Sequence, residues 1–168
     1  MENLEHLTLG RVIENAAAEA PDKVAIVDGD RRTTFAALNA TVDALAAGLA
    51  EISFKKGDRV AIYMKNSLEF VTTGRPKGAM IRHYAAVRAG REYALGTGAT
   101  ADDIFIGILP MSHSYGCGSV LVQPILLQAT LVLMDKFEVE RAFQIIEREK
   151  ITLQMGAPPH YILELNHN

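Results

Sequence analysis

Hydroxyl groups, glycines and a lysine are concentrated in one short, loop-forming stretch near the middle of the chain. The stretch reads Thr72-Thr73-Gly74-Arg75-Pro76-Lys77-Gly78. Glycines let backbone N–H groups approach an anion, hydroxyls donate hydrogen bonds to phosphate oxygens, and a lysine supplies a positive charge. The stretch is not a Walker loop, in which the lysine follows a glycine and precedes Ser or Thr, because Lys77 precedes Gly78. Loop chemistry alone leaves two interpretations open, a phosphate-binding loop and a surface turn with a solvated lysine.

A second candidate site surrounds His113. The segment 110–116 directly follows the apolar run 104–109, and the turn 156–160 directly follows the strand-like run 152–155. Parallel sheets bind ligands beyond the carboxyl ends of their strands, so both segments are candidates to meet a ligand. A lone histidine in such a loop is otherwise most often structural. His83 and His160 are interpreted as structural, and Cys117 as a small buried packing residue.

The elements that must position these residues alternate along the chain. A β-hairpin or longer loop is predicted over 24–35, around the Asp28-Gly29 turn. Further strands are predicted at 60–64, 79–82, 104–109, 131–134 and 152–155, and helices at 9–20, from 33 or 34 to 49, from 66 or 67 to 70, 84–95, 118–127 and 139–150. In the last helix Val139, Ala142, Phe143 and Ile146 are predicted to face inward. This alternation predicts an α/β fold of mostly parallel sheets with flanking helices.

Composition excludes several classes of protein. The chain has 168 residues, 49% of them hydrophobic and 22% charged, which predicts a folded core. Its net charge of −3 and the absence of a basic cluster argue against nucleic-acid binding. A single cysteine allows no intrachain disulfide and no Cys-rich zinc site. We find no signal peptide in residues 1–9 and no transmembrane segment, so a cytoplasmic protein is expected.

The motifs resemble, in order, those of the adenylate-forming superfamily, which contains acyl-CoA synthetases, firefly-type luciferases and peptide-synthetase adenylation domains. Residues 72–81 are similar to the second half of its phosphate-loop signature, roughly Thr-Ser-Gly-Thr-Thr-Gly-x-Pro-Lys-Gly. Residues 109–116 resemble its Leu-Pro-x-x-His-x-x-Gly motif. Segments 33–39, 56–61, 66–70 and 156–159 also resemble family segments. The resemblance covers two collinear blocks, 1–71 and 72–168, both parts of the large N-terminal domain of an acyl-CoA synthetase.

The resemblance implies an AMP-forming carboxylate–CoA ligase of fatty acid metabolism. Such an enzyme activates a fatty or other apolar acid with ATP to an acyl-adenylate and then transfers the acyl group to CoA. The resemblance assigns the ATP β- and γ-phosphates to Thr72, Thr73, Gly74, Arg75, Pro76, Lys77 and Gly78. It also places His113 and Gly116 at the acyl-substrate pocket.

The chain departs from the family pattern at two places. Residues 70–71 abut Thr72, so an internal deletion near residue 71 removes strands and helices and the leading Thr-Ser-Gly of the loop, and Val71 stands where the family has glycine. The Mg²⁺-coordinating glutamate and the catalytic C-terminal lysine domain are expected outside this chain. The sequence therefore identifies no metal ligand and no catalytic residue. Two alternatives stay open, a non-catalytic remnant that binds nucleotide or acyl group, and a luciferase-like or peptide-synthetase member.

Overall fold

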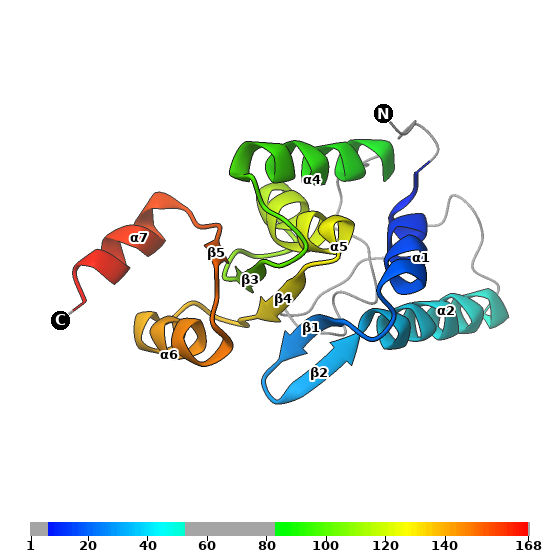
Figure 1. Ribbon diagram of the computed structural model, residues 1–168, viewed down its shortest axis with the longest axis horizontal. Coiled ribbons are helices and arrows are strands. Elements are labelled where there is room, and N and C mark those ends of the chain that lie inside the picture. The colour runs from blue at the N-terminus through cyan, green and yellow to red at the C-terminus, as the bar shows by residue number, and fades with distance from the viewer. Residues whose placement is uncertain (1–6, 53–82, 168) are drawn as a thin grey trace.

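The computed structural model describes residues 7–52 and 83–167. Within these residues five strands form one sheet, in the order β2-β1-β4-β3-β5 (Figure 1). The strands are β1 (Val24–Asp28), β2 (Arg31–Thr34), β3 (Ile104–Gly107), β4 (Thr130–Leu133) and β5 (Leu153–Gln154). Only the β1–β2 pair is antiparallel, and the other three pairs are parallel. The predicted α/β fold with a mostly parallel sheet is therefore confirmed.

Helices connect and cover the strands. They are α1 (Leu9–Glu19), α2 (Phe35–Glu51), α4 (His83–Thr97), the π-helix η2 (Gly116–Val122), α5 (Gln123–Leu127), α6 (Val139–Glu149) and α7 (Pro158–Leu165). From β3 the chain passes through η2 and α5 to β4, and from β4 through α6 back across to β5. Because parallel crossovers are right-handed, these opposite steps place α5 and α6 on opposite faces of the sheet. Figure 1 agrees, with α4 and α5 on one side and α6 on the other.

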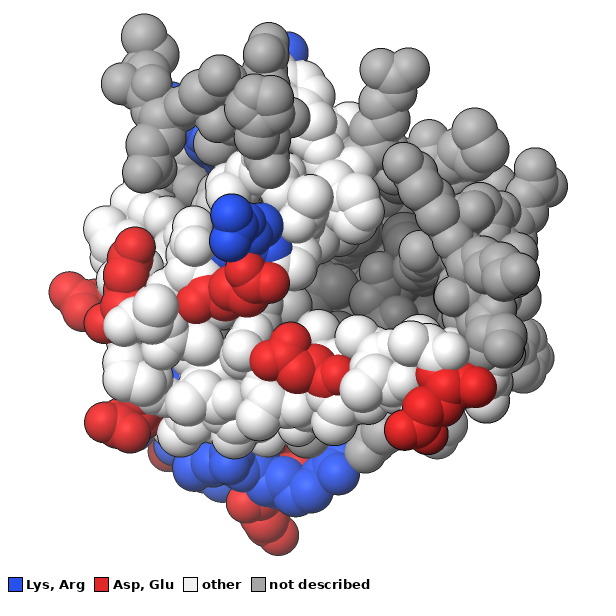
Figure 2. Space-filling model, turned by 90° about the vertical axis from the view of Figure 1, so that its right-hand side faces the viewer, with Lys and Arg blue, Asp and Glu red and all other residues white. Residues whose placement is uncertain are grey.

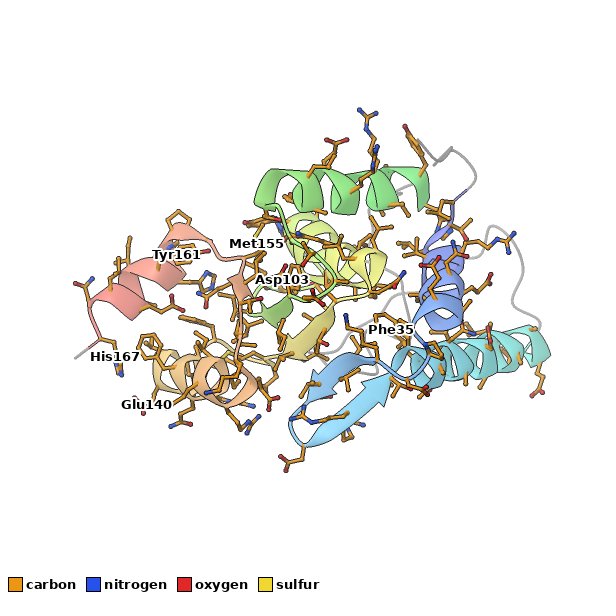
Figure 3. All side chains as sticks on the ribbon, viewed as in Figure 1. Phe35, Asp103, Glu140, Met155, Tyr161 and His167 are labelled. Atoms are coloured by element: carbon orange, nitrogen blue, oxygen red, sulfur yellow. The ribbon has the colours of Figure 1, made fainter. Side chains whose placement is uncertain are left out.

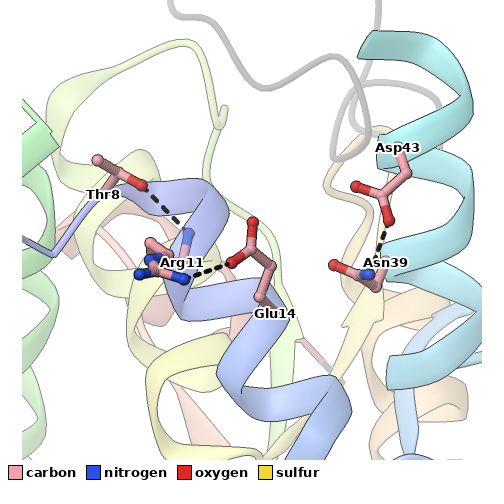
Figure 4. A network of polar contacts seen from close by, with 5 residues as sticks. All are labelled: Thr8, Arg11, Glu14, Asn39 and Asp43. Carbon is pink, nitrogen blue, oxygen red and sulfur yellow. Dashed lines mark hydrogen bonds and ion pairs between the residues drawn. The ribbon is translucent and has the colours of Figure 1, made fainter. Parts of the chain in front are cut away.

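The first two helices begin at threonine caps. The Thr8 hydroxyl accepts a hydrogen bond from the Arg11 amide, and the Thr34 hydroxyl accepts one from the Ala37 amide, both at 3.2 Å. Such caps satisfy N–H groups that have no partner within the helix. Figure 4 shows the Thr8 cap beside the Arg11–Glu14 ion pair, with the Asn39–Asp43 hydrogen bond on the neighbouring α2. These contacts confirm the predicted starts of both helices.

Strand β1 joins the part of the chain before residue 72 to the part after it. Ile26 pairs with Leu131 of β4, and the Thr130 hydroxyl donates to the Val24 carbonyl at 2.7 Å. Both sides of this pairing contribute to one hydrophobic core. Its fully buried large side chains include Phe35, Phe105, Ile26, Leu38, Ile106, Met111, Leu131 and Met134.

The structure corrects two details of the predicted elements. The helix predicted at 118–127 begins at Gly116 and opens with a π-helical segment. In α6 the prediction for Phe143 is wrong, because this side chain is 40% exposed whereas Ile145 is 6% exposed. Ala142 is fully buried, so the face of α6 that packs on the sheet is centred on Ala142 and Ile145. The elements predicted at 60–64, 66–70 and 79–82 lie outside the described residues.

Charged side chains of both signs are mixed on one face of the molecule (Figure 2). The face drawn in Figure 2 carries both acidic and basic side chains, and neither kind covers it. Across residues 7–52 and 83–167, no helix has the length and hydropathy that crossing a bilayer requires.

Candidate functional site

The two candidate loops follow neighbouring parallel strands. Phe105 pairs with Leu153 and Ile106 with Gln154, so β3 and β5 run side by side and end at the same edge of the sheet. Residues 110–116 follow β3 and residues 156–160 follow β5. Ligands of such sheets bind beyond this edge. The structure therefore brings to one edge the two segments that the sequence proposed separately.

The turn after β3 is fixed by its own backbone. The His113 amide donates to the Pro110 carbonyl at 3.0 Å, and the Cys117 amide donates to the His113 carbonyl at 2.8 Å. Met111 is fully buried and anchors the turn in the core. The turn therefore holds a defined shape while it exposes the His113 side chain.

The His113 ring is oriented by the backbone of the same turn. Its Nδ1 accepts a hydrogen bond from the Tyr115 amide at 3.2 Å. In the neutral ring this acceptor role assigns the proton to Nε2. Nε2 is thus the nitrogen that can donate to an oxygen of a bound ligand. The arrangement suits recognition of a carbonyl or carboxylate group.

Gly116 has a different role, because it permits close contact between two backbone segments. A Cβ atom at this position would lie 2.2 Å from the Pro110 carbonyl oxygen and 2.8 Å from its carbon. Real Cβ atoms do not come so near to backbone atoms. The turn that presents His113 therefore requires glycine at 116.

The helical segment after the turn is closely packed. The Ser119 hydroxyl donates to the Tyr115 carbonyl at 2.7 Å. Burial raises the pKa of the Cys117 thiol, which disfavours the reactive thiolate. This supports the interpretation of Cys117 as a packing residue. π-Helical segments such as η2 are frequent at functional sites.

The segment after β5 is bonded to the first turns of α7. The Tyr161 hydroxyl accepts a hydrogen bond from the Gly156 amide at 2.9 Å and donates to the Gln154 carbonyl at 3.2 Å. The His160 Nδ1 accepts one from the Ala157 amide at 2.9 Å. His160 also contacts Phe137 edge-on, with ring centroids 4.6 Å apart. These contacts agree with the structural interpretation of His160.

Three tyrosines gather near the two loops. The rings of Tyr93 on α4 and Tyr115 have centroids 5.7 Å apart. Burial raises the pKa of Tyr115, and the neighbouring phenols of Tyr161 and Tyr93 act in the same direction. Figure 3 shows Tyr161 on α7 and Met155 in the segment that leads into it. Tyr115 and Tyr161 are not predicted as site residues from the sequence. Tyr115 occupies a variable position of the motif, and Tyr161 belongs to none of the recognised motifs.

Other predicted residues are not brought into this site. The predicted ATP phosphate-binding residues, Thr72, Thr73, Gly74, Arg75, Pro76, Lys77 and Gly78, lie outside the described residues. His83 is described, and its Nδ1 accepts a hydrogen bond from the Leu9 amide at 3.3 Å, which links α4 to the start of α1. In the described parts of the chain, no three His, Cys, Asp or Glu side chains are grouped to hold a metal ion. The described residues therefore form no site that holds a metal ion through protein ligands alone.

Comparison with known proteins identifies sequence relatives. The AMP-binding enzyme family matches residues 13–71 and 72–168. The 4-coumarate-CoA ligase 1 of Narcissus pseudonarcissus is 34% identical over 92 residues, which make up 52% of this chain and 17% of that enzyme. A 4-coumarate:CoA ligase 1 of Petunia hybrida is 28% identical over 115 residues, 66% of this chain and 20% of that enzyme. The chain thus matches about a fifth or less of the length of these curated relatives.

Solved structures share the fold. A putative long-chain-fatty-acid CoA ligase from Rhodopseudomonas palustris matches with a TM-score of 0.86 at 18% identity, over 98% of this chain and 66% of that one. The o-succinylbenzoate CoA synthetase of Bacillus subtilis, in complex with its acyl-adenylate intermediate, matches with a TM-score of 0.82 at 17% identity. That match covers 94% of this chain and 64% of the solved one. At such identities the likeness establishes the fold.

The family match bears out the resemblance of the motifs. It extends on both sides of the junction at residues 71 and 72, and includes the phosphate-loop string, the His113 turn and the segment after β5. The solved structures add that the described sheet and helices have the arrangement found in the adenylate-forming enzymes they represent. This chain belongs to the AMP-binding enzyme family.

Proposed function

We propose that the chain is the nucleotide- and acid-binding part of a cytoplasmic, AMP-forming carboxylate–CoA ligase. The observation that carries this proposal is the family match over residues 13–71 and 72–168, because it includes both candidate binding segments. The two sequence relatives support it, since they are named as 4-coumarate–CoA ligases. We propose blocks 1–71 and 72–168 as two segments of one large domain.

The proposed chemistry begins with attack of the acid's carboxylate on the ATP α-phosphorus. Pyrophosphate leaves, and the thiol of CoA then attacks the acyl carbon of the resulting acyl-adenylate, which forms the thioester and releases AMP. In this chain the loop 72–78 would hold the β- and γ-phosphates through Lys77, the two threonine hydroxyls and its backbone N–H groups. Binding of these two phosphates aligns the pyrophosphate leaving group for in-line displacement.

The acid would bind at the edge shared by the loops after β3 and β5. His113 Nε2 would donate to the acid's carboxyl or carbonyl oxygen, and Gly116 would keep the turn in shape. Beside the turn, the rings of Tyr115 and Tyr93 offer an apolar surface. We therefore propose a fatty or other apolar acid as the substrate. The solved relative named as a putative long-chain-fatty-acid CoA ligase supports this class.

A second candidate function is a non-catalytic fragment that binds nucleotide or acyl group. The observation that favours it is the junction at residue 71, where Val71 directly precedes the loop in place of the family's glycine. A β-branched residue resists positive φ there, so the backbone would approach a phosphate less closely.

Pyrophosphate release from ATP distinguishes these two functions. The ligase proposal expects acid-dependent release from a longer protein in which the missing family segments are restored, and a fall of about a hundredfold or more when Lys77→Ala is introduced there. Lys136→Ala is the matched control, because this lysine side chain is 78% exposed and forms a surface ion pair with Glu138 at 3.6 Å. Saturable ATP binding without release from that longer protein would contradict the ligase and favour the fragment.

A further inference from the structure

We propose that Tyr161 is a positioning residue of the acid site, which fixes the segment 154–157 and thereby favours flat, aromatic carboxylic acids. This inference rests on the proposed function, and it assigns a task to a side chain on α7 that the motifs do not include.

The Tyr161 hydroxyl joins two backbone groups on either side of Met155. It accepts the Gly156 N–H at 2.9 Å and donates to the Gln154 C=O at 3.2 Å. Both capacities of one hydroxyl are thus used on one segment of backbone. These two bonds define where the chain goes after β5 ends at Gln154.

The Tyr161 ring also lies against this segment. A Cβ atom on Gly156 would meet ring carbon atoms of Tyr161 at 3.1 Å and 3.2 Å. The absence of a side chain at Gly156 therefore lets the ring lie directly on the backbone. The Tyr161 ring and the backbone of residues 154–157 together form one continuous surface, called the wall below. Movement of the ring would move this wall.

Core packing does not hold α7 in its place. No residue of this helix is buried, and Ile162, Leu163 and Leu165 are 57%, 54% and 84% exposed. Ring contacts of His160 with Phe137 and of His167 with Phe143, and a hydrogen bond between His167 and Glu140, join its two ends to residues 137–143. Polar contacts tie the helix to the segment before it. Besides those of Tyr161, Gln154 Nε2 donates to the Glu164 carboxylate at 2.8 Å and 3.0 Å, and His160 bonds to Ala157. Because these bonds are few, loss of the Tyr161 hydroxyl is expected to loosen the segment.

The segment that Tyr161 holds and the His113 turn lie at the same edge of the sheet. β3 and β5 end side by side, and the phenol of Tyr161 raises the pKa of Tyr115, after the larger effect of burial. A fixed wall beside aromatic rings suits a flat, aromatic acid, which gains stacking contacts and loses little freedom on binding. A straight-chain acid adapts to a displaced wall at little cost. The position of Tyr161 should therefore matter more for an aromatic acid.

Equilibrium titration of the 168-residue chain with 4-coumarate and with decanoate tests this inference. In Tyr161→Phe, which keeps the ring, the Kd for 4-coumarate should rise about threefold to tenfold and that for decanoate less than twofold. The Gly156 amide should exchange faster with solvent. Gly156→Ala, which displaces the ring and keeps the hydroxyl, should give the same selective loss. Tyr84→Phe, on α4 and 37% exposed, is the matched control and should change neither Kd.

The outcomes separate this inference from the proposed function. An equal loss of affinity for both acids would overturn the inference, because it would assign Tyr161 a general structural role. Unchanged affinity for 4-coumarate in Tyr161→Phe would also overturn it, while the proposed function would stand. Failure of the unaltered chain to bind either acid would instead contradict the proposed function, and the inference would fall with it.

Discussion

His113 and Gly116 belong to one turn, and each contributes to it in a different way. His113 contributes a side chain whose Nδ1 is occupied by the Tyr115 amide, so that Nε2 is left to donate. Gly116 contributes only the absence of a side chain, because the Pro110 carbonyl occupies the space that a Cβ atom would need. At the scale of single residues, the motif therefore combines one exposed side chain with a free donor nitrogen and one requirement of the backbone.

Gly116→Ala is expected to destabilise the fold by about 1–3 kcal/mol, because the added methyl group forces the backbone at Pro110 to move. Urea unfolding followed by circular dichroism measures the change. Gly48→Ala in α2 is the matched control, since a Cβ atom there meets nothing within 4 Å. The control should be stabilised by about 0.5–1 kcal/mol, from helix propensity alone. Equal effects of the two substitutions would contradict the role assigned to Gly116.

Glu149 connects α6 to the hairpin through two arginines. Its carboxylate accepts hydrogen bonds from Arg32 and from Arg148, both at 2.8 Å, and its side chain is 8% exposed. Burial by itself would raise the pKa of Glu149, but the hydrogen bonds and charges of Arg32 and Arg148 outweigh it and lower the pKa below 4.5. The contribution to stability is therefore fully present above pH 4.5 and is lost as the pH falls through the folded-state pKa.

Glu149→Gln is expected to cost about 1–2 kcal/mol at pH 7, because the charged hydrogen bonds are lost while Arg32 remains half-exposed. Below pH 4.5 the difference from the unaltered protein should shrink. Urea midpoints measured from pH 7 down to pH 3 follow this change. The exposed neighbour Glu147, changed to Gln, serves as the control. A difference that stays constant over this range would show that Glu149 does not act through its charge.

At the scale of elements, the loop after β3 is supported by the packing of η2 on α4. Two glycines allow this close approach, one on each helix. A Cβ atom on Gly90 of α4 would lie 2.7 Å from the Val122 side chain, and one on Gly118 of η2 would lie 2.9 Å from the Tyr93 ring. The two helices therefore pack nearly backbone to backbone, which fixes the direction in which η2 leaves the His113 turn.

Gly90→Ala is expected to destabilise the protein by about 1–3 kcal/mol, because the two helices must separate. Adding Val122→Ala removes the Val122 methyl group that the new methyl group at position 90 would contact. The double variant should therefore lose less stability than the sum of the two single variants. A double-mutant cycle by urea unfolding gives this coupling. Strict additivity would show that Gly90 and Val122 do not meet in solution.

At the scale of the whole molecule, the described sheet ends in β2 on one side and β5 on the other. Within the described residues β5 pairs only with β3, and large apolar side chains such as Ile52 and Leu165 are 74% and 84% exposed. Sheet edges and exposed apolar side chains favour association between copies of a chain.

We therefore expect the isolated 168-residue chain to associate as its concentration rises. Sedimentation velocity and thermal melts at several concentrations measure this association. Leu165→Lys, which removes the most exposed of the large apolar side chains, should reduce association. A sharp, reversible and concentration-independent melt of a monomer would contradict this expectation.

The sequence predicted most of the fold because its signals are local. The caps at Thr8 and Thr34, the Asp28-Gly29 turn and the short apolar runs each act over a few residues, and the structure has the expected elements there. The π-helical segment η2 and the exposure of Phe143 were not predicted. Both depend on what a helix packs against, and helical spacing alone does not contain this information.

What the sequence by itself determined is the family and the candidate residues, because ordered motifs such as 72–81 and 109–116 carry chemistry in their residue types and spacing. What only the tertiary structure decided is how residues far apart in the chain meet. The parallel pairing of β3 with β5 places the turn at His113 beside the segment that Tyr161 holds. That pairing forms between residues about fifty positions apart, and its partners are selected by burial of the whole sheet rather than by any local pattern.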